Sequence, residues 1–305
     1  MRSMKRFVIA LVAVGFLIAL GAPAYAGSII WGNNASFGNV TLEAFDSATG
    51  LLIPGQQFLV PNLTARGDNG RGVAVLGHTI YYTTANSGNI YVTNDLTHSN
   101  DGILVNTGFP GIANVATDGT LIYANSYQSS SGVINKYNTS GVLVGTVTVG
   151  VGFFGRDGFE VQNNPFLDGG ATTFISNRGD ATSPYDVYRS DGTSLVSGFI
   201  TPSANGFGTG QTGIAYDGND YFISDLNNNR LFEYSGTGVF IRIIDLSANP
   251  NPFSGTRYLE DLSAVGNTIN NPPPDGGTVP EPATLTMLGT GVAILASRRR
   301  RKLAV

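Results

Sequence analysis

Short runs in which apolar and polar residues alternate recur along the middle of the chain, separated by turns rich in Gly, Asn and Asp. Residues 133–137 and 140–147 form one such pair of runs, and residues 230–234 and 238–244 form another. A period of two predicts half-buried β-strands, because successive side chains of a strand point to opposite faces of a sheet. Asp-Gly pairs at 118–119, 191–192 and 217–218 predict type I′ hairpin turns between the strands.

A longer repeat is superimposed on this alternation. An apolar strand, a turn and a strand with aromatic residues recur together, and the copies begin at Gly72, Asn114, Gly158, Gly213 and Asp261. Successive copies start 42, 44, 55 and 48 residues apart, and each of the first four is followed by two more strands. Four strands in roughly 40–50 residues are typical of one blade of a β-propeller.

The fifth copy supplies only an inner strand, and the rest of its blade is expected from the other end of the chain. Residues 29–31, 39–45 and 57–60 have the pattern of the three missing strands. A blade built from both ends leaves no open sheet edge between the first and last blades. The sequence therefore predicts an all-β fold, a β-propeller of about five four-stranded blades over residues 27–270. The alternative is a β-sandwich or jelly roll, whose strands do not require this period.

Composition agrees with a turn-rich β protein and excludes several kinds of chemistry. The chain has 41 Gly and 14 Pro in 305 residues. It has no Cys, which excludes disulfides, cysteine zinc sites and a thiol nucleophile. We expect its two histidines, His78 and His98, to be solvated surface residues.

The net charge of −4 is the sum of segments of opposite sign. Eight of the 17 basic residues lie at the two tips, before residue 7 and at 298–302, where no Asp or Glu is found. Residues 27–297 carry nine basic and 21 acidic residues, a net charge of −12. An acidic middle predicts that the protein does not bind nucleic acid, because affinity for phosphates comes from Lys and Arg.

Residues 1–26 have the organisation of a secretory signal peptide. Arg2, Lys5 and Arg6 precede an apolar run at residues 7–20. Ala24 and Ala26 are small residues at positions −3 and −1 relative to a cleavage site before Gly27. We expect signal peptidase to cleave after Ala26. The alternative, an uncleaved membrane anchor, fits less well with the short apolar run.

The C-terminal end has four parts. A Pro/Gly linker covers residues 271–279, a Pro-Glu-Pro motif follows, and apolar residues cover 283–297. A helix of this apolar length is about 22 Å long and predicts a short transmembrane segment. A basic cluster then ends the chain on the expected cytoplasmic side, so the propeller lies outside. The cluster comprises Arg298, Arg299, Arg300, Arg301 and Lys302.

Residues 279–302 resemble the PEP-CTERM sorting signal, which is also called the "ice-binding protein C-terminal" motif. The resemblance implies that Pro280, Glu281 and Pro282 are recognised by an exosortase and that Arg298–Arg301 stop transfer. It further implies export across the inner membrane of a Gram-negative bacterium that makes exopolysaccharide. The protein would be transiently anchored in the membrane and then lie at the cell surface or outside the cell.

A second resemblance lies in the fourth full repeat. Residues 221–234 resemble an NHL-type repeat through Asp225, an Asn-x-Arg at 228–230 and the aromatic residues that follow. The resemblance implies an NHL-like propeller, although NHL rings usually have six blades. Asp225, Asn227 and Asn229 also alternate as in a calcium loop, but Arg230 and Gly236 stand where that loop has Gly and Glu. We favour turn residues that cap their own backbone, with calcium as the alternative.

Polar residues gather at the predicted starts of the inner strands, near one mouth of the central channel, where propeller ligands usually bind. This candidate ligand site comprises Arg71, Asn114, Asp157, Glu160, Glu260 and Asp261. Tyr127 and Tyr185 are expected in polar loops, where they would stack on sugar rings. Gluconolactonase-like propellers hold a divalent ion at this place, so a metal-dependent lactonase or lyase is an alternative.

The sequence favours an exported, non-catalytic binding or matrix module associated with exopolysaccharide. Apart from the calcium candidate it predicts no cofactor. Signal peptidase and exosortase are the expected partners during export. The enzyme and a purely structural surface protein remain alternatives, because a propeller fold by itself does not decide function.

Overall fold

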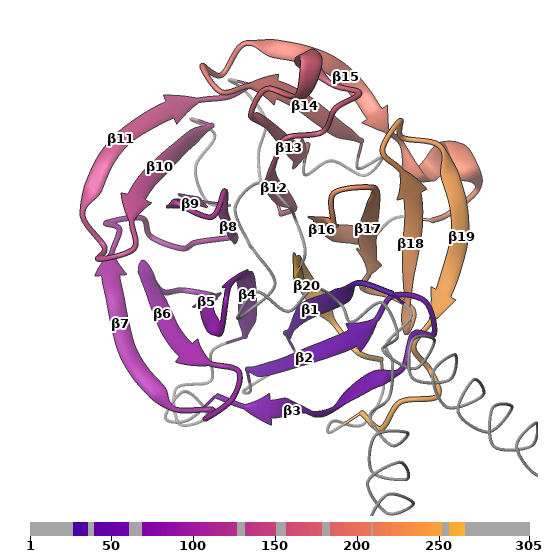
Figure 1. Ribbon diagram of the computed structural model, residues 1–305, viewed down its shortest axis with the longest axis horizontal. Coiled ribbons are helices and arrows are strands. Elements are labelled where there is room, and N and C mark those ends of the chain that lie inside the picture. Colours follow the sequence, from indigo (N-terminus) through magenta and orange to yellow (C-terminus); the bar gives the residue numbers. More distant parts are fainter. Residues whose placement is uncertain are drawn as a thin grey trace, which may run out of the picture.

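The computed structural model describes residues 27–35, 40–60, 69–126, 132–150, 157–178, 184–208, 210–251 and 256–265. Within these ranges the chain folds into five four-stranded antiparallel sheets that surround a central axis (Figure 1). The predicted all-β propeller of five blades is thereby confirmed. The expected signal peptide and the expected C-terminal transmembrane helix lie outside the described residues. No helix within those ranges is long and apolar enough to cross a membrane.

We number the blades from the one that holds the N-terminal strands and give each from its inner strand outward. Blade 1 consists of β20 (Leu259–Val265), β1 (Ile29–Asn34), β2 (Thr41–Asp46) and β3 (Leu52–Leu59). Blade 2 consists of β4 (Gly70–Leu76), β5 (Thr79–Thr84), β6 (Asn89–Asn94) and β7 (Asn100–Asn106). Blade 3 consists of β8 (Asn114–Thr117), β9 (Leu121–Asn125), β10 (Val133–Asn138) and β11 (Leu143–Thr148).

The two remaining blades follow the same plan. Blade 4 consists of β12 (Phe159–Gln162), β13 (Thr173–Asn177), β14 (Tyr185–Arg189) and β15 (Ser194–Ile200). Blade 5 consists of β16 (Gln211–Tyr216), β17 (Asp220–Asp225), β18 (Arg230–Ser235) and β19 (Phe240–Asp245). Two short 3-10 helices, η2 (Asp168–Gly170) and η3 (Pro202–Asn205), lie in loops of the described chain.

Blade 1 joins the two ends of the propeller, as the repeat pattern predicts. β1 pairs antiparallel with β20, with Ile29 opposite Val265 and Trp31 opposite Ser263, and its other edge pairs with β2. In Figure 1 the C-terminal strand β20 lies innermost, beside the N-terminal strand β1. The ring is thus closed by hydrogen bonds between segments more than 200 residues apart in the sequence.

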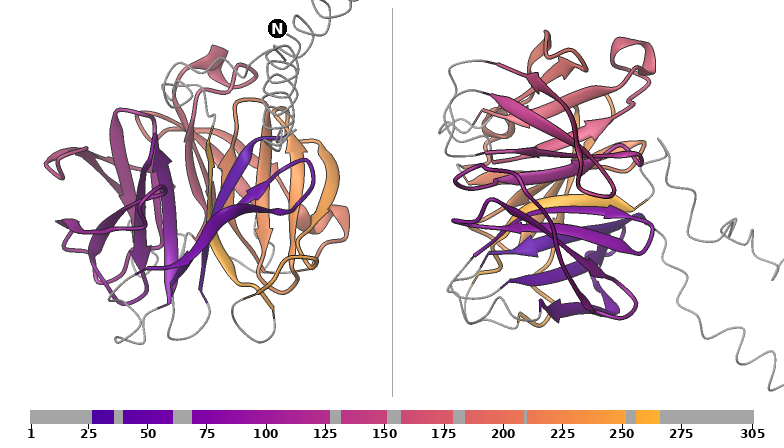
Figure 2. Two further views of the ribbon diagram at one scale, coloured as in Figure 1. Left: turned by 60° about the horizontal axis from the view of Figure 1, so that its bottom comes forward. Right: turned by 90° about the vertical axis from the view of Figure 1, so that its left-hand side faces the viewer.

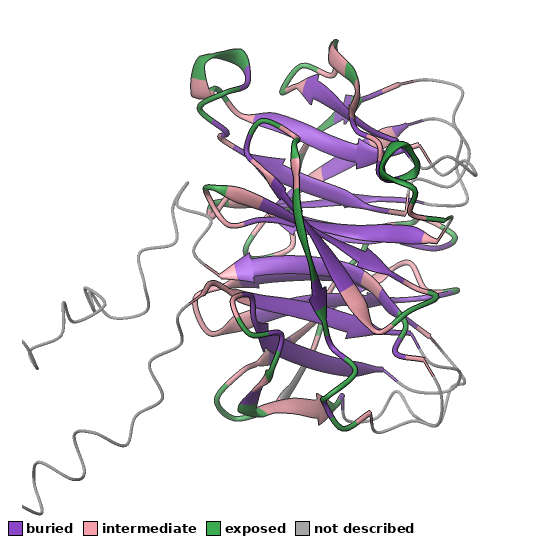
Figure 3. Ribbon diagram, turned by 90° about the vertical axis from the view of Figure 1, so that its right-hand side faces the viewer, coloured by how far each residue is buried: buried purple, intermediate pink, exposed green. Residues whose placement is uncertain are grey.

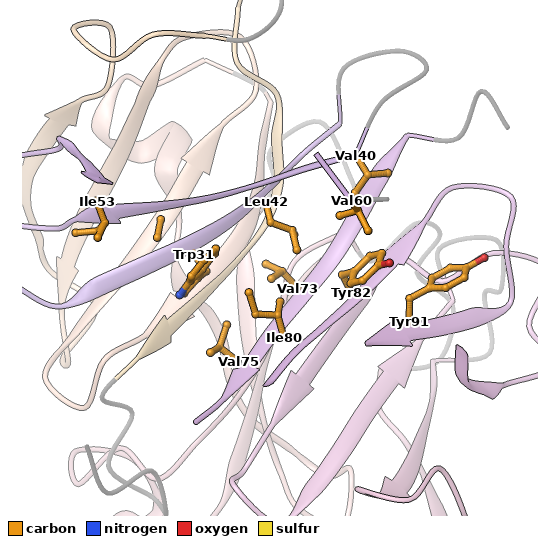
Figure 4. Close-up of a cluster of buried hydrophobic side chains, with 11 residues drawn as sticks. Trp31, Val40, Leu42, Ile53, Val60, Val73, Val75, Ile80, Tyr82 and Tyr91 are labelled. Carbon is orange, nitrogen blue, oxygen red and sulfur yellow. The ribbon is translucent and has the colours of Figure 1, made fainter. Parts of the chain in front are cut away.

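The apolar core lies in the junctions between neighbouring blades. Trp31 and Leu42 of blade 1 pack against Val73 and Tyr82 of blade 2 (Figure 4). Four further clusters combine residues of the other neighbouring pairs of blades. Figure 3 shows the consequence, with buried residues along the strands and exposed residues concentrated in turns and outer edges. Each blade therefore depends on both neighbours to bury its two faces. This burial stabilises the fold by roughly 25 cal/mol per Å² of apolar surface removed from water.

The inner strands β4, β8, β12, β16 and β20 follow one another around the axis. In the side views of Figure 2 the blades stand across the thickness of the ring, so the inner strands run from one face to the other. Glycines permit close approaches between neighbouring inner strands, and two of them serve as examples. A Cβ at Gly158 would lie 1.9 Å from the carbonyl oxygen of Thr212, and one at Gly213 would lie 2.5 Å from the Cα of Asp261.

The hairpin turns differ from the prediction in type. At 118–119, 191–192 and 217–218 only the glycine has a positive φ, whereas a type I′ turn needs a positive φ at both central residues. The aspartate caps its own turn instead. The Asp118 carboxylate accepts hydrogen bonds from the backbone N–H groups of Thr120 and Leu121, both at 2.8 Å. The position of the turns was predicted correctly and their backbone type was wrong.

Candidate functional site at the mouth of the channel

Three charged side chains meet where the inner strands begin. Arg71 lies on β4, Glu260 on β20, and Asp157 two residues before β12. Arg71 Nη1 is 3.0 Å from Glu260 Oε2. The charge of Arg71 also acts on Asp157, and the charge of Asp157 acts on Glu260. One guanidinium from blade 2 thus stabilises two carboxylates from blades 1 and 4.

Burial sets the protonation of these carboxyl groups. It raises the pKa of Glu260 to about 7, with Arg71 opposing the shift and Asp157 adding to it. Burial also raises the pKa of Asp157, again opposed by Arg71. The mouth therefore combines the hydrogen-bond donors of Arg71, the acceptor oxygens of Asp157 and Glu260, and a proton that Glu260 exchanges near neutral pH. Such a set is suited to binding hydroxyl groups and to proton transfer.

Glu160 and Asp261 lie deeper and are engaged by backbone groups. Glu160 Oε1 accepts a hydrogen bond from the N–H of Val161 at 2.8 Å, and burial raises the pKa of Glu160 to about 8. Asp261 Oδ2 accepts one from the N–H of Val73 at 3.2 Å, and burial raises the pKa of Asp261 well above its ordinary value. Both side chains are buried.

These two carboxyl groups interact with the backbone of every inner strand. The N–H donors that stabilise their charged forms are Val73 on β4, Val115 on β8, Val161 on β12, Tyr216 on β16 and Leu262 on β20. Inner strands have one edge without a strand partner, and the carboxyl groups supply acceptors for that edge. Glu160 and Asp261 therefore act first as links between blades.

Asn114 also belongs to the buried part of the predicted set. Its Nδ2 donates a hydrogen bond to Asn125 Oδ1 at 3.3 Å, within blade 3. The predicted candidate site thus divides in two. Arg71, Asp157 and Glu260 come together at the mouth, whereas Asn114, Glu160 and Asp261 are buried in the wall of the channel.

Apart from Asp225, a ring of polar residues around the mouth was missed by sequence reasoning. Its members are the residues with which the second strand of each blade ends: Asn33 and Asn34, Thr83 and Thr84, Asn125, Ser176 and Asn177, and Ser224 and Asp225. Thr83 Oγ1 accepts from the Gly72 N–H at 2.7 Å, and Ser224 Oγ accepts from the Gly213 N–H at 2.9 Å. The signal was available, because each repeat has a polar residue at this position.

Some buried polar atoms at this end have no hydrogen-bond partner within the described residues. They include both ends of the Gln211 side-chain amide and Asn33 Oδ1. Buried polar atoms in native proteins are normally paired with protein or with ordered water. These atoms therefore favour water, or the hydroxyl groups of a ligand, as further occupants of the mouth.

The loop after β17 shows the physical basis of the NHL-like motif. Asp225 Oδ2 accepts hydrogen bonds from Arg230 Nε at 2.8 Å and from Asn228 Nδ2 at 3.0 Å. Asp225 Oδ1 accepts from the Asn227 N–H at 3.0 Å, and Asn229 Oδ1 accepts from the Arg257 N–H at 2.6 Å. Calcium at Asp225, Asn227 and Asn229 stays a prediction that must compete with these contacts. Across the described ranges no group of three or more His, Asp or Glu is placed to hold a metal.

The sequence also made predictions for two tyrosines and for the two histidines. Tyr185 was expected in a polar loop, and this was wrong, because it is buried at the start of β14. Its hydroxyl donates a hydrogen bond to the Thr212 carbonyl at 2.7 Å. His98 stacks on Phe58, with ring centroids 3.8 Å apart, and His78 Nδ1 lies 2.9 Å from Asp95 Oδ1. Tyr127 lies outside the described residues.

The remaining predicted positions belong to the two tips. Ala24 and Ala26 precede the described chain, and Gly27 is its first residue. The Pro-Glu-Pro motif at 280–282 and the arginine cluster at 298–301 follow its end. Their sequence is nevertheless diagnostic, because residues 278–301 match the family model of the PEP-CTERM protein-sorting motif. The chain carries a PEP-CTERM sorting motif. This motif implies export with exosortase processing and membrane anchoring of a secreted protein.

Solved structures extend the comparison to the propeller. One chain of "Crystal structure of Nidogen/Laminin Complex" is similar, with a TM-score of 0.51 and 11% identity, over 78% of this chain and 98% of that chain. This likeness shows the propeller fold alone, and the NHL-like resemblance of residues 221–234 fits it. No curated protein matches the sequence.

Two further solved chains have lower TM-scores. A protein of unknown function from Bacteroides caccae has a TM-score of 0.43 and 15% identity, over 76% of each chain. The glutaminyl cyclase of Myxococcus xanthus has a TM-score of 0.46 and 14% identity, over 63% of this chain and 87% of that chain.

Proposed function

We propose that this PEP-CTERM protein is an exported, non-catalytic binding or matrix module associated with exopolysaccharide at the cell surface. The observation that carries the proposal is the sorting motif at 278–301, which begins 13 residues after the last propeller strand. In the proposed route, signal peptidase removes residues 1–26 and exosortase acts on the tail at the inner membrane of a Gram-negative bacterium. The rigid ring then presents its channel mouth to the extracellular matrix.

The mouth favours a neutral polysaccharide as the ligand. Asp157 and Glu260 supply acceptors and Arg71 supplies donors, which together match the hydroxyl groups of sugars. Residues 27–297 carry a net charge of −12, so an acidic polymer would be repelled at low salt unless divalent cations bridged it.

Deletion of Pro280–Pro282 tests the sorting step. Cells that make the intact or the deleted protein are fractionated, and the intact mass of the released protein is measured. We expect deletion to retain the protein in the membrane fraction and to abolish C-terminal processing. Unchanged location together with an unchanged C-terminal mass would show that the motif does not direct sorting.

The binding step needs a separate test. Exopolysaccharide from the producing strain is titrated against the released protein and against Asp157→Asn and Glu260→Gln. We expect each variant to weaken binding about tenfold, the loss of one good hydrogen bond. Asp191→Asn is the control, because Asp191 is exposed in a turn of blade 4. Equal binding by all four proteins would refute the mouth as the binding site.

An enzymatic role is the alternative that one observation favours. The pKa of Glu260, raised to about 7, suits a general acid or base at neutral pH. A metal-dependent lactonase or lyase would break down the polysaccharide on addition of calcium or zinc, and Asp157→Ala or Glu160→Ala would abolish the activity. If the protein neither degrades nor binds the polysaccharide and takes up no metal, the purely structural role is left.

A further inference from the structure

A pocket lies on the face opposite the mouth, where blade 5 meets blade 1. The inner strand β16 starts at the mouth and ends at Tyr216, and the next residue, Asp217, lines this pocket. The lining residues that matter here are Gly27, Ser28, Asp217, Asp220, Glu233 and Arg242. The first two come from the start of the described chain, Asp217 from the β16–β17 turn, and the others from the strands β17, β18 and β19 of blade 5.

The pocket has more negative than positive charge. The cation among its lining residues, Arg242, is already engaged: Nε lies 2.5 Å from Glu233 Oε2, and the two terminal nitrogens donate to the Ser47 and Ala48 carbonyls at 2.9 and 3.1 Å. No ion pair joins Asp217 or Asp220 to a cation in the described part of the chain.

The consequence of this imbalance is visible at Asp220. Burial raises its pKa, and the neighbouring Asp217 and Glu233 raise it further, while Arg242 opposes them. Two carboxylates at short range destabilise one another when no cation lies between them. The pocket is therefore built to accept one more positive charge.

Residue 27 fits against this pocket only as glycine. A Cβ on Gly27 would lie 2.4 Å from the Ala48 nitrogen and 2.5 Å from Ser47 Oγ. The next residue fixes the chain in place: the Ser28 carbonyl accepts from the Ser47 N–H at 2.9 Å, and Ser28 Oγ donates to Asp217 Oδ2 at 2.6 Å. The nitrogen of Gly27 therefore belongs to a segment that is bonded directly to the acidic pocket.

We propose that signal-peptide removal completes this pocket, because the α-ammonium group freed on Gly27 binds the carboxylates of Asp217 and Asp220. In the precursor this nitrogen is a neutral amide. Hydrolysis of the Ala26–Gly27 bond consumes one water and leaves a carboxylate on Ala26 and an ammonium group on Gly27. The exported protein thus gains a charged contact between blades 5 and 1 that the precursor lacks. The proposal uses the cleavage position predicted above and is independent of any ligand at the mouth.

The pKa of the Gly27 amine tests the proposal. The released protein is acetylated at a series of pH values, and labelled peptides are quantified by mass spectrometry. Lys136 is the only lysine between residues 27 and 270, so it serves as an internal reference. We expect the Gly27 amine to titrate about one unit above the ordinary 7.7–8.0 of an α-amino group. Asp217→Asn and Asp220→Asn should each return it toward that range.

Asp191→Asn is the control, since Asp191 lies in another Asp-Gly turn, between β14 and β15 of blade 4, and is exposed. Asp217 also caps its turn through the Asn219 N–H, so Asp220→Asn provides a second variant that leaves this cap in place. An ordinary or lowered pKa of the Gly27 amine would overturn the proposal, as would a pKa that neither substitution changes. A mature N-terminus at any residue other than 27 would do the same, whether or not the tail is sorted.

Discussion

Arg257 and Glu43 form a buried ion pair that connects the segment before β20 to β2. Their side chains are 1% and 0% exposed, and Arg257 Nε lies 2.5 Å from Glu43 Oε2. Arg257 also donates to the Pro250 carbonyl at 2.9 Å and lies over the ring of Phe45. Burial raises the pKa of Glu43, and Arg257 opposes that shift. The pair therefore depends on both partners being present.

Arg257→Met should lower the free energy of unfolding by about 3–5 kcal/mol, because it removes the cationic partner of the buried Glu43 carboxylate and leaves that group with the amide donors of Gln57 and Asn34 alone. Urea denaturation of the released protein measures this loss. Arg189→Met is the control: Arg189 pairs with Asp168 at the surface, 42% and 30% exposed, where a pair contributes about 0–1 kcal/mol. Similar losses for the two variants would contradict the role assigned to burial.

Glu160 should make the stability of the protein depend on pH. Its pKa is raised from 4.5 to about 8 in the folded state, so the folded protein holds a proton that the unfolded chain releases. The contribution of Glu160 is therefore complete below about pH 4.5 and is lost as the pH rises toward 8. Over this range the free energy of unfolding should fall by a few kcal/mol.

Glu160→Gln should reduce this slope, because glutamine keeps an acceptor for the Val161 N–H without a titrating proton. Asp261 shifts in the same direction and should leave part of the slope. Denaturant melts of both proteins at pH 5, 6, 7 and 8 provide the comparison. Parallel pH profiles would show that Glu160 is ionised at neutral pH in the folded protein.

At the scale of elements, glycines set the distance between inner strands. Gly158 faces the Thr212 carbonyl of the next blade at a distance that leaves no room for a methyl group. The inner strands β4 and β16 show the same crowding at Gly72 and Gly213, which face the backbones of β8 and β20. Their spacing is thus determined by the backbone, and the outer strands have more freedom.

Gly158→Ala should cost about 1–3 kcal/mol or more, because blades 4 and 5 must separate to admit the methyl group. Gly145→Ala is the control, since Gly145 lies in the outer strand β11 and a methyl group added there would meet no described atom within 4 Å. That substitution should leave stability unchanged or raise it by up to about 1 kcal/mol. Thermal unfolding measures the stability of both variants, and equal melting temperatures would contradict the role assigned to Gly158.

The elements were predictable where one repeat could be compared with another. The phrase starting at Gly72, Asn114, Gly158, Gly213 and Asp261 located all five inner strands, because alternation and spacing are local properties of the sequence. The site was predicted less completely. The sequence pattern placed Glu160 and Asp261 at the mouth. It could not show that backbone N–H groups engage both carboxyl groups, because these contacts depend on how neighbouring blades pack.

At the scale of the whole molecule, stability depends on blade 1, which draws its inner strand from the C-terminal end and its other strands from the N-terminal end. Without β20, the edge of β1 and the apolar residues of the junctions on either side would face water. Among the described strands, no other sheet combines segments from both ends of the ring.

A chain ending at residue 258 should therefore fail to fold, whereas one ending at residue 270 should melt like the released protein. Far-ultraviolet circular dichroism and thermal unfolding distinguish these outcomes. A cooperative transition in the shorter chain would show that four blades close without the shared strand.

The shared blade also sets an order of events during synthesis and export. β1 is the first strand made and β20 the last of those described, and only residues 266–277 separate β20 from the sorting motif. Fully extended, that segment reaches about 40 Å. Ring closure and recognition by exosortase therefore become possible at almost the same point in the synthesis of the chain. A chain whose synthesis stops before residue 259 lacks both β20 and the sorting motif. Such a product cannot close the ring and is not recognised for sorting, so it is exposed to proteases.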